Sequence, residues 1–434
     1  MRVELRPTTP SELSHIVDLE RASYPEDEAA TAASLDYRLR EAGEYFRTVV
    51  VDDAVGGFIC GTRCVSMTAD AMTTHAAGAP VLAIHSVVVA PEKRRRGVAT
   101  KALALYVEEM QRSSARSIRL IAKAALLPLY RGAGFEVLGL SPIVHGADPW
   151  FECAYDLRRL DMVQVDAFTD RVFGGNPAAV VFAMRDDDWM AKLAIENNLS
   201  ETVYLERSTG NTFRIRWFTP GGEVDLCGHA TLGAAKALHA TGRADFPMTF
   251  ETRNVGTLTV DRRVADGREW LAMDFPTADL VEADPPAGLE KALNADALLF
   301  VGRGPDSVPD WFVEVSPRVF AALDVDVAAL AAEPDVVRGV IVTARGDDGV
   351  DFKSRFFAPR MGIPEDPVTG SAHTLLAKYW ETKLQREGPL LAHQTSKRGG
   401  VLRVETTPNG RTIIQGQAAL VFHAKLCLDD DDDV

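Results

Sequence analysis

Two short segments carry the residue types and spacing best suited to chemistry: Asp225-Leu-Cys-Gly-His-Ala-Thr-Leu232 and Glu365-Asp-Pro-Val-Thr-Gly-Ser-Ala-His373. Each places small, polar and ionisable side chains directly before a run with helical periodicity, Gly233 to Leu238 and Thr374 to Thr382. The first turn of a helix has unpaired N–H groups and a partial positive charge, so it can hold an anion. The two segments predict one site for a small anionic molecule, built from two similar lobes.

A third segment with chemical potential is Arg94-Arg-Arg-Gly-Val-Ala99, which lies between an apolar strand pattern and a helical one. Gly97 and the small Ala99 would let backbone N–H groups approach a phosphate, and the arginines supply counter-charge. A solvated basic turn is the alternative reading of these six residues. The segment predicts a phosphate-binding loop separate from the first site.

The elements that position this loop form an α/β pattern. Helical spacing begins at Ser11, which is a candidate N-cap. Strands are predicted at 1–6, 46–51, 57–64, 81–89, 118–122 and 135–140, and helices at 11–21, 100–112 and 128–132.

The pattern restarts around residues 155–162, and Met162 to Phe168 is typical of the first strand of a new domain. A second seam is predicted where Pro285-Pro286 interrupts the pattern. We therefore predict domains at 1–158 and 159–428, the latter with lobes at about 159–280 and 281–428. Residues 429–434 form an acidic tail, and no short-period repeat indicates a solenoid.

Composition narrows the function classes. The 434 residues suggest roughly two or three domains. The formal net charge of −15 argues against general nucleic-acid binding. No apolar stretch reaches the ~18 residues of a membrane span, and the first ten residues lack a secretory signal, so we expect a cytoplasmic protein. Five scattered cysteines predict neither a disulfide framework nor a structural zinc site.

The order of strand, Arg-x-x-Gly-x-Ala loop, helix, strand and Leu129-Tyr-Arg-Gly-Ala-Gly-Phe135 resembles the GNAT N-acetyltransferase superfamily over about residues 1–157. Glu20 to Ala30 and Leu126 to Phe135 resemble its arylalkylamine N-acetyltransferase branch. The resemblance implies a mixed sheet flanked by helices, with acetyl-CoA bound by six residues: Arg94, Arg95, Arg96, Gly97, Val98 and Ala99.

Two catalytic residues follow from that resemblance. His85 would be the base that deprotonates an ammonium substrate, its near-neutral pKa suiting the task. Tyr130 would protonate the departing CoA thiolate. A core histidine and a packing tyrosine are the alternatives, and Ala83 stands where the family often has a second histidine. The acidic run at 26–28 would attract a cationic amine or is simply solvated.

Residues 162–426 resemble the phenazine-biosynthesis (PhzF-like) isomerase family, which has the two-lobed diaminopimelate epimerase fold. Six motifs in order carry the resemblance: Gln164 to Thr169, Gly175 to Val180, Asn198 to Val203, Arg216 to Pro220, Asp225 to Leu232 and Glu365 to Ala372. The overall fold class is thus α/β and α+β multidomain, with a central helix in each C-terminal lobe.

Carried over residue by residue, the resemblance makes Glu201 the proton shuttle, its pKa raised by a closed apolar cleft. It places Gly228, His229, Asp366, Gly370 and Ser371 around the substrate, with backbone N–H groups holding a carboxylate. Glu201 could instead be a surface or capping residue, and Asp366 a helix N-cap.

The cysteines discriminate between two chemistries of this fold. Epimerases of this fold use two opposed thiols, one near each helix start, to invert a carbon. The motif Glu365 to His373 contains no thiol, and Cys227 is better interpreted as a packing residue. We therefore predict isomerisation through one carboxylate, with no metal or redox cofactor.

The sequence as a whole predicts a bifunctional enzyme: acetyl-CoA-dependent N-acetylation of a small arylalkyl amine, and isomerisation of a small carboxylate metabolite. The expected partners are small molecules, not nucleic acid or membrane, with a homodimer through the C-terminal domain. Two alternatives stay open. One domain is a binding or regulatory module, or Glu201 performs lactone hydrolysis or elimination.

Overall fold

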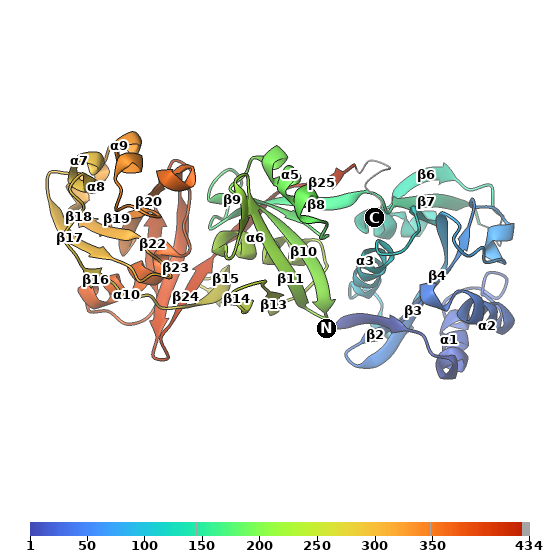
Figure 1. Ribbon diagram of the computed structural model, residues 1–434. Coiled ribbons are helices and arrows are strands. Elements are labelled where there is room, and N and C mark those ends of the chain that lie inside the picture. The colour runs from blue at the N-terminus through green and yellow to red at the C-terminus, as the bar shows by residue number, and fades with distance from the viewer. Residues whose placement is uncertain (145, 147, 348, 428–434) are drawn as a thin grey trace. The chain divides into compact units, whose positions relative to one another are not determined.

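The computed structural model describes residues 1–427 except 145, 147 and 348, and it divides into two compact units (Figure 1). Unit 1 contains residues 1–160 with Leu426 and Cys427, and unit 2 contains residues 161–425. The predicted boundary after residue 158 lies between β7 (Trp150–Asp156) and β8 (Leu160–Ala167). The predicted acidic tail at 429–434 lies outside the described residues.

Unit 1 is built on a seven-stranded sheet in the order β1-β2-β3-β4-β5-β7-β6. The β4–β5 pair is parallel and its other pairs are antiparallel. The remaining strands are β1 (Val3–Pro7), β2 (Phe46–Val51), β3 (Ala54–Cys64), β4 (Val81–Val89), β5 (Ser117–Lys123) and β6 (Glu136–Leu140). The helices are α1 (Leu13–Arg21), α2 (Ala32–Glu41), α3 (Val98–Met110) and α4 (Leu127–Gly132).

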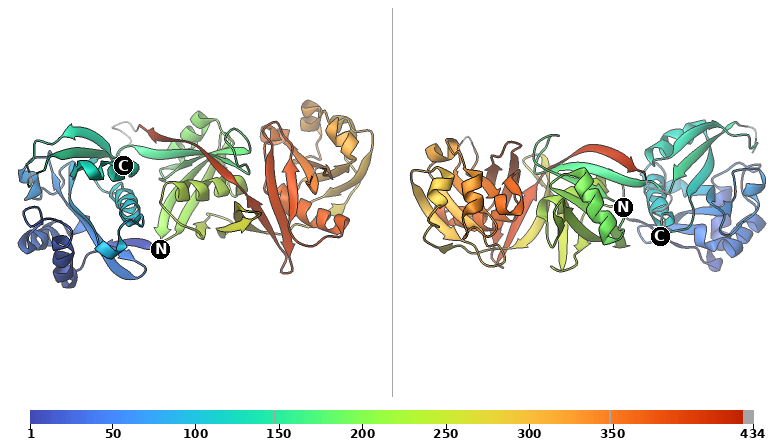
Figure 2. Two further views of the ribbon diagram at one scale, coloured as in Figure 1. Left: turned by 180° about the vertical axis from the view of Figure 1, so that it is seen from behind. Right: turned by 45° about the horizontal axis from the view of Figure 1, so that its top comes forward.

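Helices cover both faces of this sheet because neighbouring residues in a strand point to opposite sides. In β3, Phe58 packs in a cluster with residues of α1 and α2, whereas Ile59 packs in a cluster with residues of α3. Both side chains are fully buried. The strand pattern therefore fixes a three-layer arrangement, which the views in Figure 2 show from two further sides.

Three details of unit 1 differ from the sequence prediction, and one of them is the strand β7, which was not predicted. The helix α2 was not predicted, although Thr31 caps it by accepting a hydrogen bond from the Ser34 backbone N–H. Ser11 is not the N-cap of the first helix, because Thr9 and Glu12 form a capping box around a short 3-10 turn at Pro10–Glu12 that precedes α1.

Unit 2 has two lobes, each wrapped around one central helix. In the first lobe α6 (Gly228–Ala240) packs against β9, β10 and β15. The elements of this lobe are β8, β9 (Asn176–Val181), β10 (Glu201–Thr209), β11 (Thr212–Thr219), β12 (Gly222–Val224), β13 (Met248–Glu251), β14 (Thr257–Ala265), β15 (Arg268–Pro276) and α5 (Asp187–Asn197).

In the second lobe α10 (Ala372–Leu384) packs against β23 and β24. The strands of this lobe are β16 (Val281–Glu282), β17 (Leu298–Arg303), β18 (Trp311–Val315), β19 (Val340–Arg345), β20 (Phe352–Ala358), β21 (Ile363–Asp366), β22 (Leu390–Gln394), β23 (Gly400–Thr407) and β24 (Arg411–Gly416). Its shorter helices are α7 (Leu289–Leu293), α8 (Pro317–Ala321) and α9 (Val327–Ala332).

The central helix α6 is buried on nearly every side because its sequence is rich in alanine and glycine. A side chain at Gly233 would come within 3.7 Å of Val165, so a small residue lets the helix lie close to the sheet. The helix ends in a Schellman motif, in which Gly242 has φ +71° and the Arg243 N–H donates to the Leu238 carbonyl.

The lobes are joined by antiparallel pairing of β15 with β24. The last strand, β25 (Ala418–Leu426), then returns to lie beside β8. The second lobe consequently does not run to residue 428 as predicted. Its final strand belongs to the sheet of the first lobe, because the carboxylate of Asp161 on β8 holds His423 and Lys425.

Candidate active sites of the two units

The starts of α6 and α10 converge in unit 2. A methyl group added to Gly370 would lie 3.9 Å from the Gly228 Cα and 3.8 Å from the Phe168 ring. The two helix starts therefore lie within contact distance of each other across the lobes. The two motifs far apart in sequence form one site, as their similarity predicts.

Glu201 and His229 face each other at this junction. Glu201 begins β10 and His229 lies in the first turn of α6, with Glu201 Oε2 2.8 Å from His229 Nε2. Only 9% of Glu201 and 6% of His229 are exposed. Among the described residues neither atom has an aligned hydrogen-bond partner. The pair is thus close, buried and available to a bound molecule.

Cys227 lies on the other side of the His229 ring, with its Sγ 3.4 Å from Nδ1. Burial first, and then the charge of Glu201, raise the pKa of Cys227 to about 11, so it is a neutral thiol near pH 7. Burial lowers the pKa of His229, but Cys227 and Glu201 outweigh it and the pKa lies well above its ordinary value. Since the thiol is uncharged, the Glu201 carboxylate is the charge that favours an imidazolium.

Asn176 connects this pair to the second lobe. Its Nδ2 donates to Asp366 Oδ1 and to the Val368 carbonyl, each at 2.9 Å, while its Oδ1 accepts from Ser200 Oγ at 2.9 Å. The Nδ2 atom also lies 3.2 Å from His229 Nδ1. Because both amide protons are used by Asp366 and Val368, the Nδ1 proton of an imidazolium is left to the Cys227 sulfur.

Asp366 ends β21 and is enclosed by polar groups. Thr369 Oγ1 donates to its Oδ2, and Gln394 Nε2 donates to its backbone carbonyl at 2.9 Å. Burial, opposed by the positive charge of His229, raises the pKa of Asp366 to about 6. Asp366 is not the N-cap that its sequence context favours, because α10 begins at Ala372 with Ser371 as its N-cap.

The surroundings of Glu201 are therefore polar, whereas the sequence predicted an apolar cleft. Sequence reasoning identified Glu201, His229, Asp366 and the two glycines, which the structure brings together with Ser371. It missed Asn176, Thr369 and Gln394. Asn176 stands in the Gly175-Asn-Pro motif, a usable signal, but nothing in the sequence around Gln394 indicates its role.

Cys227, His229 and Glu201 also offer one ligand atom each within 4.8 Å of one another. Sulfur, imidazole nitrogen and carboxylate oxygen are ligands that a divalent ion such as Zn²⁺ accepts. The cluster can therefore be read as a proton-transfer site or as a metal site, and a direct test is needed.

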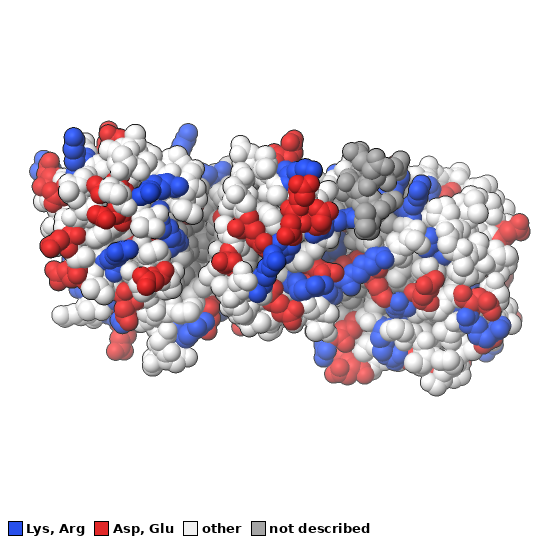
Figure 3. Space-filling view, viewed as in Figure 1, with Lys and Arg blue, Asp and Glu red and all other residues white. Residues whose placement is uncertain are grey.

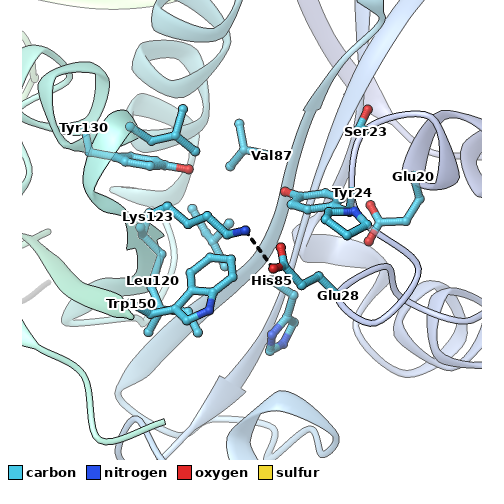
Figure 4. Close-up of a pocket in the computed structure, with 14 residues that line it drawn as sticks. Glu20, Ser23, Tyr24, Glu28, His85, Val87, Leu120, Lys123, Tyr130 and Trp150 are labelled. Atoms are coloured by element: carbon cyan, nitrogen blue, oxygen red, sulfur yellow. Dashed lines mark hydrogen bonds and ion pairs between the residues drawn. The ribbon is translucent and has the colours of Figure 1, made fainter. Parts of the chain in front are cut away.

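In unit 1 the candidate site lies where two parallel strands separate. β4 and β5 are hydrogen-bonded only over Val81–Ala83 and Ser117–Arg119. Beyond these residues a pocket of about 170 Å³ opens, lined by 14 residues: Glu20, Ser23, Tyr24, Pro25, Glu28, Ile84, His85, Val87, Leu120, Ile121, Lys123, Leu126, Tyr130 and Trp150 (Figure 4). Both predicted catalytic residues of this unit line the same pocket.

Tyr130 and Tyr24 point their hydroxyl groups toward each other across this pocket (Figure 4). Burial raises the pKa of Tyr130 well above its ordinary value, so the phenol keeps its proton near neutral pH. Tyr24, which sequence reasoning missed, has its pKa raised in the same way and is hydrogen-bonded to the Val87 backbone. Tyr130 is therefore a protonated group able to donate into the pocket.

His85 differs from the prediction in its pKa. Its Nε2 lies 2.7 Å from Thr62 Oγ1, and its Nδ1 has no aligned partner among the described residues. Burial, helped by the positive charge of Arg38, lowers the pKa of His85 well below its ordinary value. The expected near-neutral pKa is wrong, and His85 is an uncharged imidazole near neutral pH.

The predicted cofactor loop sits between β4 and α3. Gly97 has φ +78°, a conformation that favours glycine, and Arg95 has φ +59°. Arg94 is partly committed to the fold, since it donates to the Val89 carbonyl and to Ser23 Oγ, each at 2.8 Å. Arg95 and Arg96 are exposed, and Val98 is buried at the start of α3.

The acidic run at 26–28 divides into two roles. Glu26 and Asp27 are exposed, whereas Glu28 lines the pocket and its Oε1 lies 2.7 Å from Lys123 Nζ. Lys123 Nζ also lies 2.9 Å from Asp148 Oδ2 and 5.5 Å from the centre of the Trp150 ring. The pocket already holds one cation between carboxylates and an aromatic ring.

Acidic and basic side chains are mixed over the face in Figure 3. Among the described residues, no helix combines the length and the apolar character that a membrane span requires.

Comparisons with known proteins agree with these two units. Residues 165–424 match a family model described as phenazine biosynthesis-like protein, and residues 4–138 match one described as acetyltransferase (GNAT) domain. An uncharacterized isomerase of Halalkalibacterium halodurans is 41% identical over 271 residues, which are 61% of this chain and 97% of that protein. One from Pseudomonas aeruginosa is 45% identical over 275 residues, covering 62% and 99%.

A solved structure agrees with the same region. The crystal structure of a phenazine biosynthesis protein of the PhzF family from Enterococcus faecalis is 38% identical, with a TM-score of 0.57. The match covers 62% of this chain and all of that one.

Proposed function

The chain belongs to the phenazine biosynthesis-like family, and we propose that it combines two reactions, one in each unit. Unit 2 is an isomerase that moves a proton between two carbons of a small carboxylate metabolite. Unit 1 is an N-acetyltransferase that uses acetyl-CoA and a small amine. Both substrates are proposals, and each is supported by the contents of its pocket.

The observation that carries the isomerase proposal is the Glu201–His229 pair. The two groups lie 2.8 Å apart as a charged pair and are almost fully buried. A carboxylate whose imidazolium neighbour is held by Cys227 can accept a carbon-bound proton and release it again. The reaction consumes nothing: one C–H bond breaks, Glu201 carries the proton, and a new C–H bond forms.

Solvent deuterium tests this proposal. The full-length protein is incubated in deuterated water with a panel of unsaturated small carboxylates, and products are analysed by NMR and mass spectrometry. We expect deuterium on a carbon of the product and no change in atomic composition otherwise. Addition of water to the product, or loss of a group, would instead indicate the hydrolysis or elimination alternatives.

Metal content distinguishes whether Cys227, His229 and Glu201 form a proton-transfer site or a metal site. We propose that isomerisation needs no bound ion. Dialysis against a strong chelator should then leave its rate unchanged, with the metal content of the sample measured by mass spectrometry before and after. A rate that falls on chelation and returns with Zn²⁺ would assign the three side chains to a metal.

The acetyltransferase proposal is carried by the placement of Tyr130 and His85 in the pocket between the separated strands. The amine nitrogen would attack the thioester carbonyl carbon, the C–N bond would form and the C–S bond would break. Tyr130 would give its proton to the leaving sulfur. His85 and Thr62 are placed to receive the proton that the amine loses.

An arylalkyl amine is the substrate class that this pocket supports best. The rings of Tyr24, Tyr130 and Trp150 line it, and the buried Glu28 carboxylate beside them is paired with Lys123. Release of CoA thiol, measured with acetyl-CoA against a panel of aromatic, aliphatic and polycationic amines, tests the proposal. Acetyl-CoA binding without transfer to any amine would support a binding module instead.

A homodimer through the C-terminal domain rests on the family resemblance and is proposed on that basis. Light scattering of the full chain and of residues 161–427 would test whether any dimer depends on unit 2.

A further inference from the structure

Arg398 lies in the turn between β22 and β23 of the second lobe, and its side chain contacts the first lobe. Its Nε donates to the Gly175 carbonyl at 2.8 Å, and its Nη2 donates to the Gly174 carbonyl and to Asp166 Oδ1, each at 2.7 Å. Only 1% of the Asp166 side chain is exposed, compared with 32% of the Arg398 side chain. One guanidinium therefore joins the two lobes through three charge-assisted hydrogen bonds.

The partners of Arg398 belong to the turn that leads directly into Asn176. Gly175 has φ +57°, and a Cβ atom there would lie 2.0 Å from a backbone carbonyl of β8, so the turn passes close to the end of that strand. The other oxygen of Asp166 accepts from the Phe173 N–H at 2.6 Å. The Asp166 carboxylate thus holds the beginning of the turn, and Arg398 holds its end.

The segment that carries Arg398 also contacts the second-lobe motif of the site. The Ser396 hydroxyl donates to the Pro367 carbonyl at 2.7 Å and accepts from the Gly399 N–H at 3.1 Å. The Gly399 carbonyl in turn accepts from the Gly175 N–H at 2.8 Å. One short segment therefore fixes both the turn of the first lobe and the motif of the second lobe.

The Asn176 amide connects these two stretches of chain. Its Nδ2 donates to Asp366 Oδ1 and to the Val368 carbonyl, each at 2.9 Å, and the residue is completely buried. A primary amide has two donor protons, and both are committed to the second lobe. A displacement of about 1 Å would weaken both hydrogen bonds at once and leave that oxygen of Asp366 without its donor.

We propose that Arg398 is a positioning residue of the isomerase site, which holds the turn before Asn176 so that the amide keeps Asp366 in place beside His229. The inference rests on the proposed function of unit 2, to which it adds a residue outside the six sequence motifs. Lysine is a poor substitute, because an ammonium is a single point of charge, whereas the guanidinium presents its N–H donors in one rigid plane to three fixed oxygens.

The Asn176 side chain reports its own position without any substrate. The full-length protein is labelled with ¹⁵N in its asparagine side chains, and the Nδ2 signals are assigned by their loss in Asn176→Ala. Hydrogen exchange of these protons in deuterated water is then followed by NMR. The same protein preparations are used to measure isomerisation by deuterium incorporation.

Two variants and one matched control are compared. Arg398→Lys keeps a positive charge beside the buried Asp166, and Arg398→Ala opens a space that a small cation can enter. The control is Arg411→Lys, because Arg411 also donates to a carboxylate and a carbonyl, both of Asp274, and 36% of its side chain is exposed. Circular dichroism checks that each variant is folded.

We expect the Asn176 protons to exchange about tenfold faster in Arg398→Lys than in the wild type or the control, because a loosened turn opens their hydrogen bonds. Isomerisation should slow about 10²-fold in kcat with little change in KM, as for a misplaced catalytic group. Added ethylguanidinium should restore both properties in Arg398→Ala, whereas ethylammonium should not, because only the former offers planar donors.

Unchanged exchange of the Asn176 protons in both Arg398 variants would overturn the proposal, and so would faster exchange with unchanged isomerisation. Equal rescue by ethylammonium would assign the effect to charge alone and would also overturn it. If Arg398→Ala does not fold, the Arg398→Lys comparison decides. Faster exchange in Arg398→Lys, in a protein that moves no carbon-bound proton, would keep Arg398 as the residue that holds Asn176 and reject the isomerase function, so the two failures are distinguishable.

Discussion

In unit 2 the proposed proton-transfer groups contact one another, whereas in unit 1 His85 and Tyr130 lie in different surroundings. Glu201, His229 and Cys227 form one continuous cluster, and Asn176 links it to Asp366. In the acetyltransferase pocket His85 contacts Thr62, while burial holds Tyr130 in its protonated form. The first site stabilises charged groups, and the second keeps both of its groups neutral.

This difference fits the two proposed reactions. An isomerase must return the proton it removes, so an acid and its conjugate base have to exchange roles within one small space. An acetyl transfer takes a proton from nitrogen and gives one to sulfur, and these two atoms lie on opposite sides of the reacting carbon. Separate groups suit that task, provided that each has the correct protonation state when the substrate arrives.

Removal of the Glu201 carboxylate should have the largest effect, and only on the reaction of unit 2. In Glu201→Gln we expect isomerisation, measured by deuterium incorporation, to fall about 10³-fold or more, because in the proposed reaction this carboxylate carries the proton. Acetyl transfer should be unchanged. Glu206→Gln, farther along β10, is the control, and a comparable loss there would point to damage of the strand and not to lost chemistry.

The Asp161 carboxylate should affect unit 2 alone. Burial raises the pKa of Asp161, but His423, Arg243 and Lys425 outweigh it and hold the pKa below its usual range. A lowered pKa stabilises the fold above the unfolded pKa of about 3.9, and this stability is lost as pH falls through the folded value. Asp161→Asn removes the buried carboxylate that contacts Arg243, His423 and Lys425, so we expect unit 2 to lose about 3 kcal/mol near pH 7.

Calorimetry of the full chain measures this effect. The transition assigned to unit 2 should move to lower temperature in Asp161→Asn, while that of unit 1 stays in place. Acidification of the wild type below about pH 4 should reproduce part of the shift. Equal movement of both transitions would contradict the assignment of this ion cluster to unit 2.

Loss of the Tyr130 hydroxyl should affect only the reaction of unit 1. Tyr130→Phe keeps the ring that packs on Phe135 and removes only the proton donor, so acetyl transfer should slow by about 10² in kcat with little change in KM. Tyr155→Phe is the control, because Tyr155 packs on the same Phe135 ring. An unchanged kcat in Tyr130→Phe would end its catalytic role.

The pH profile of isomerisation gives the smallest effect. Because the pKa of Asp366 is raised to about 6, its carboxylate gains a proton as pH falls through that value. We expect wild-type activity to decline by about tenfold from pH 7 to pH 5, since one pH unit below the pKa leaves about a tenth of the group ionised. Asp366→Asn should have lower activity and lack this decline between pH 7 and pH 5, whereas Glu365→Gln should retain the decline.

The sequence supported many of these conclusions because some signals are local. Strand alternation and helical periodicity located β4, α3, α6 and α10. The need for glycine at 97 follows from a left-handed backbone. Motif order identified Glu201 and His229. The helix α2 was missed although Thr31 offered a capping signal, which its residues 32–41 did not reinforce with a clear apolar stripe.

By itself the sequence determined which chemistry is available: one cysteine in residues 161–425, two small-residue helix starts, a carboxylate in Ser-Glu-Thr and a glycine-bearing arginine loop. Only the tertiary structure decided which groups touch. It placed His229 on Glu201, lowered the pKa of His85 through burial and Arg38, and carried Arg398 to Gly175 across 223 residues. Protonation states depend on burial and on charges a few ångströms away, and both depend on chain segments distant in sequence.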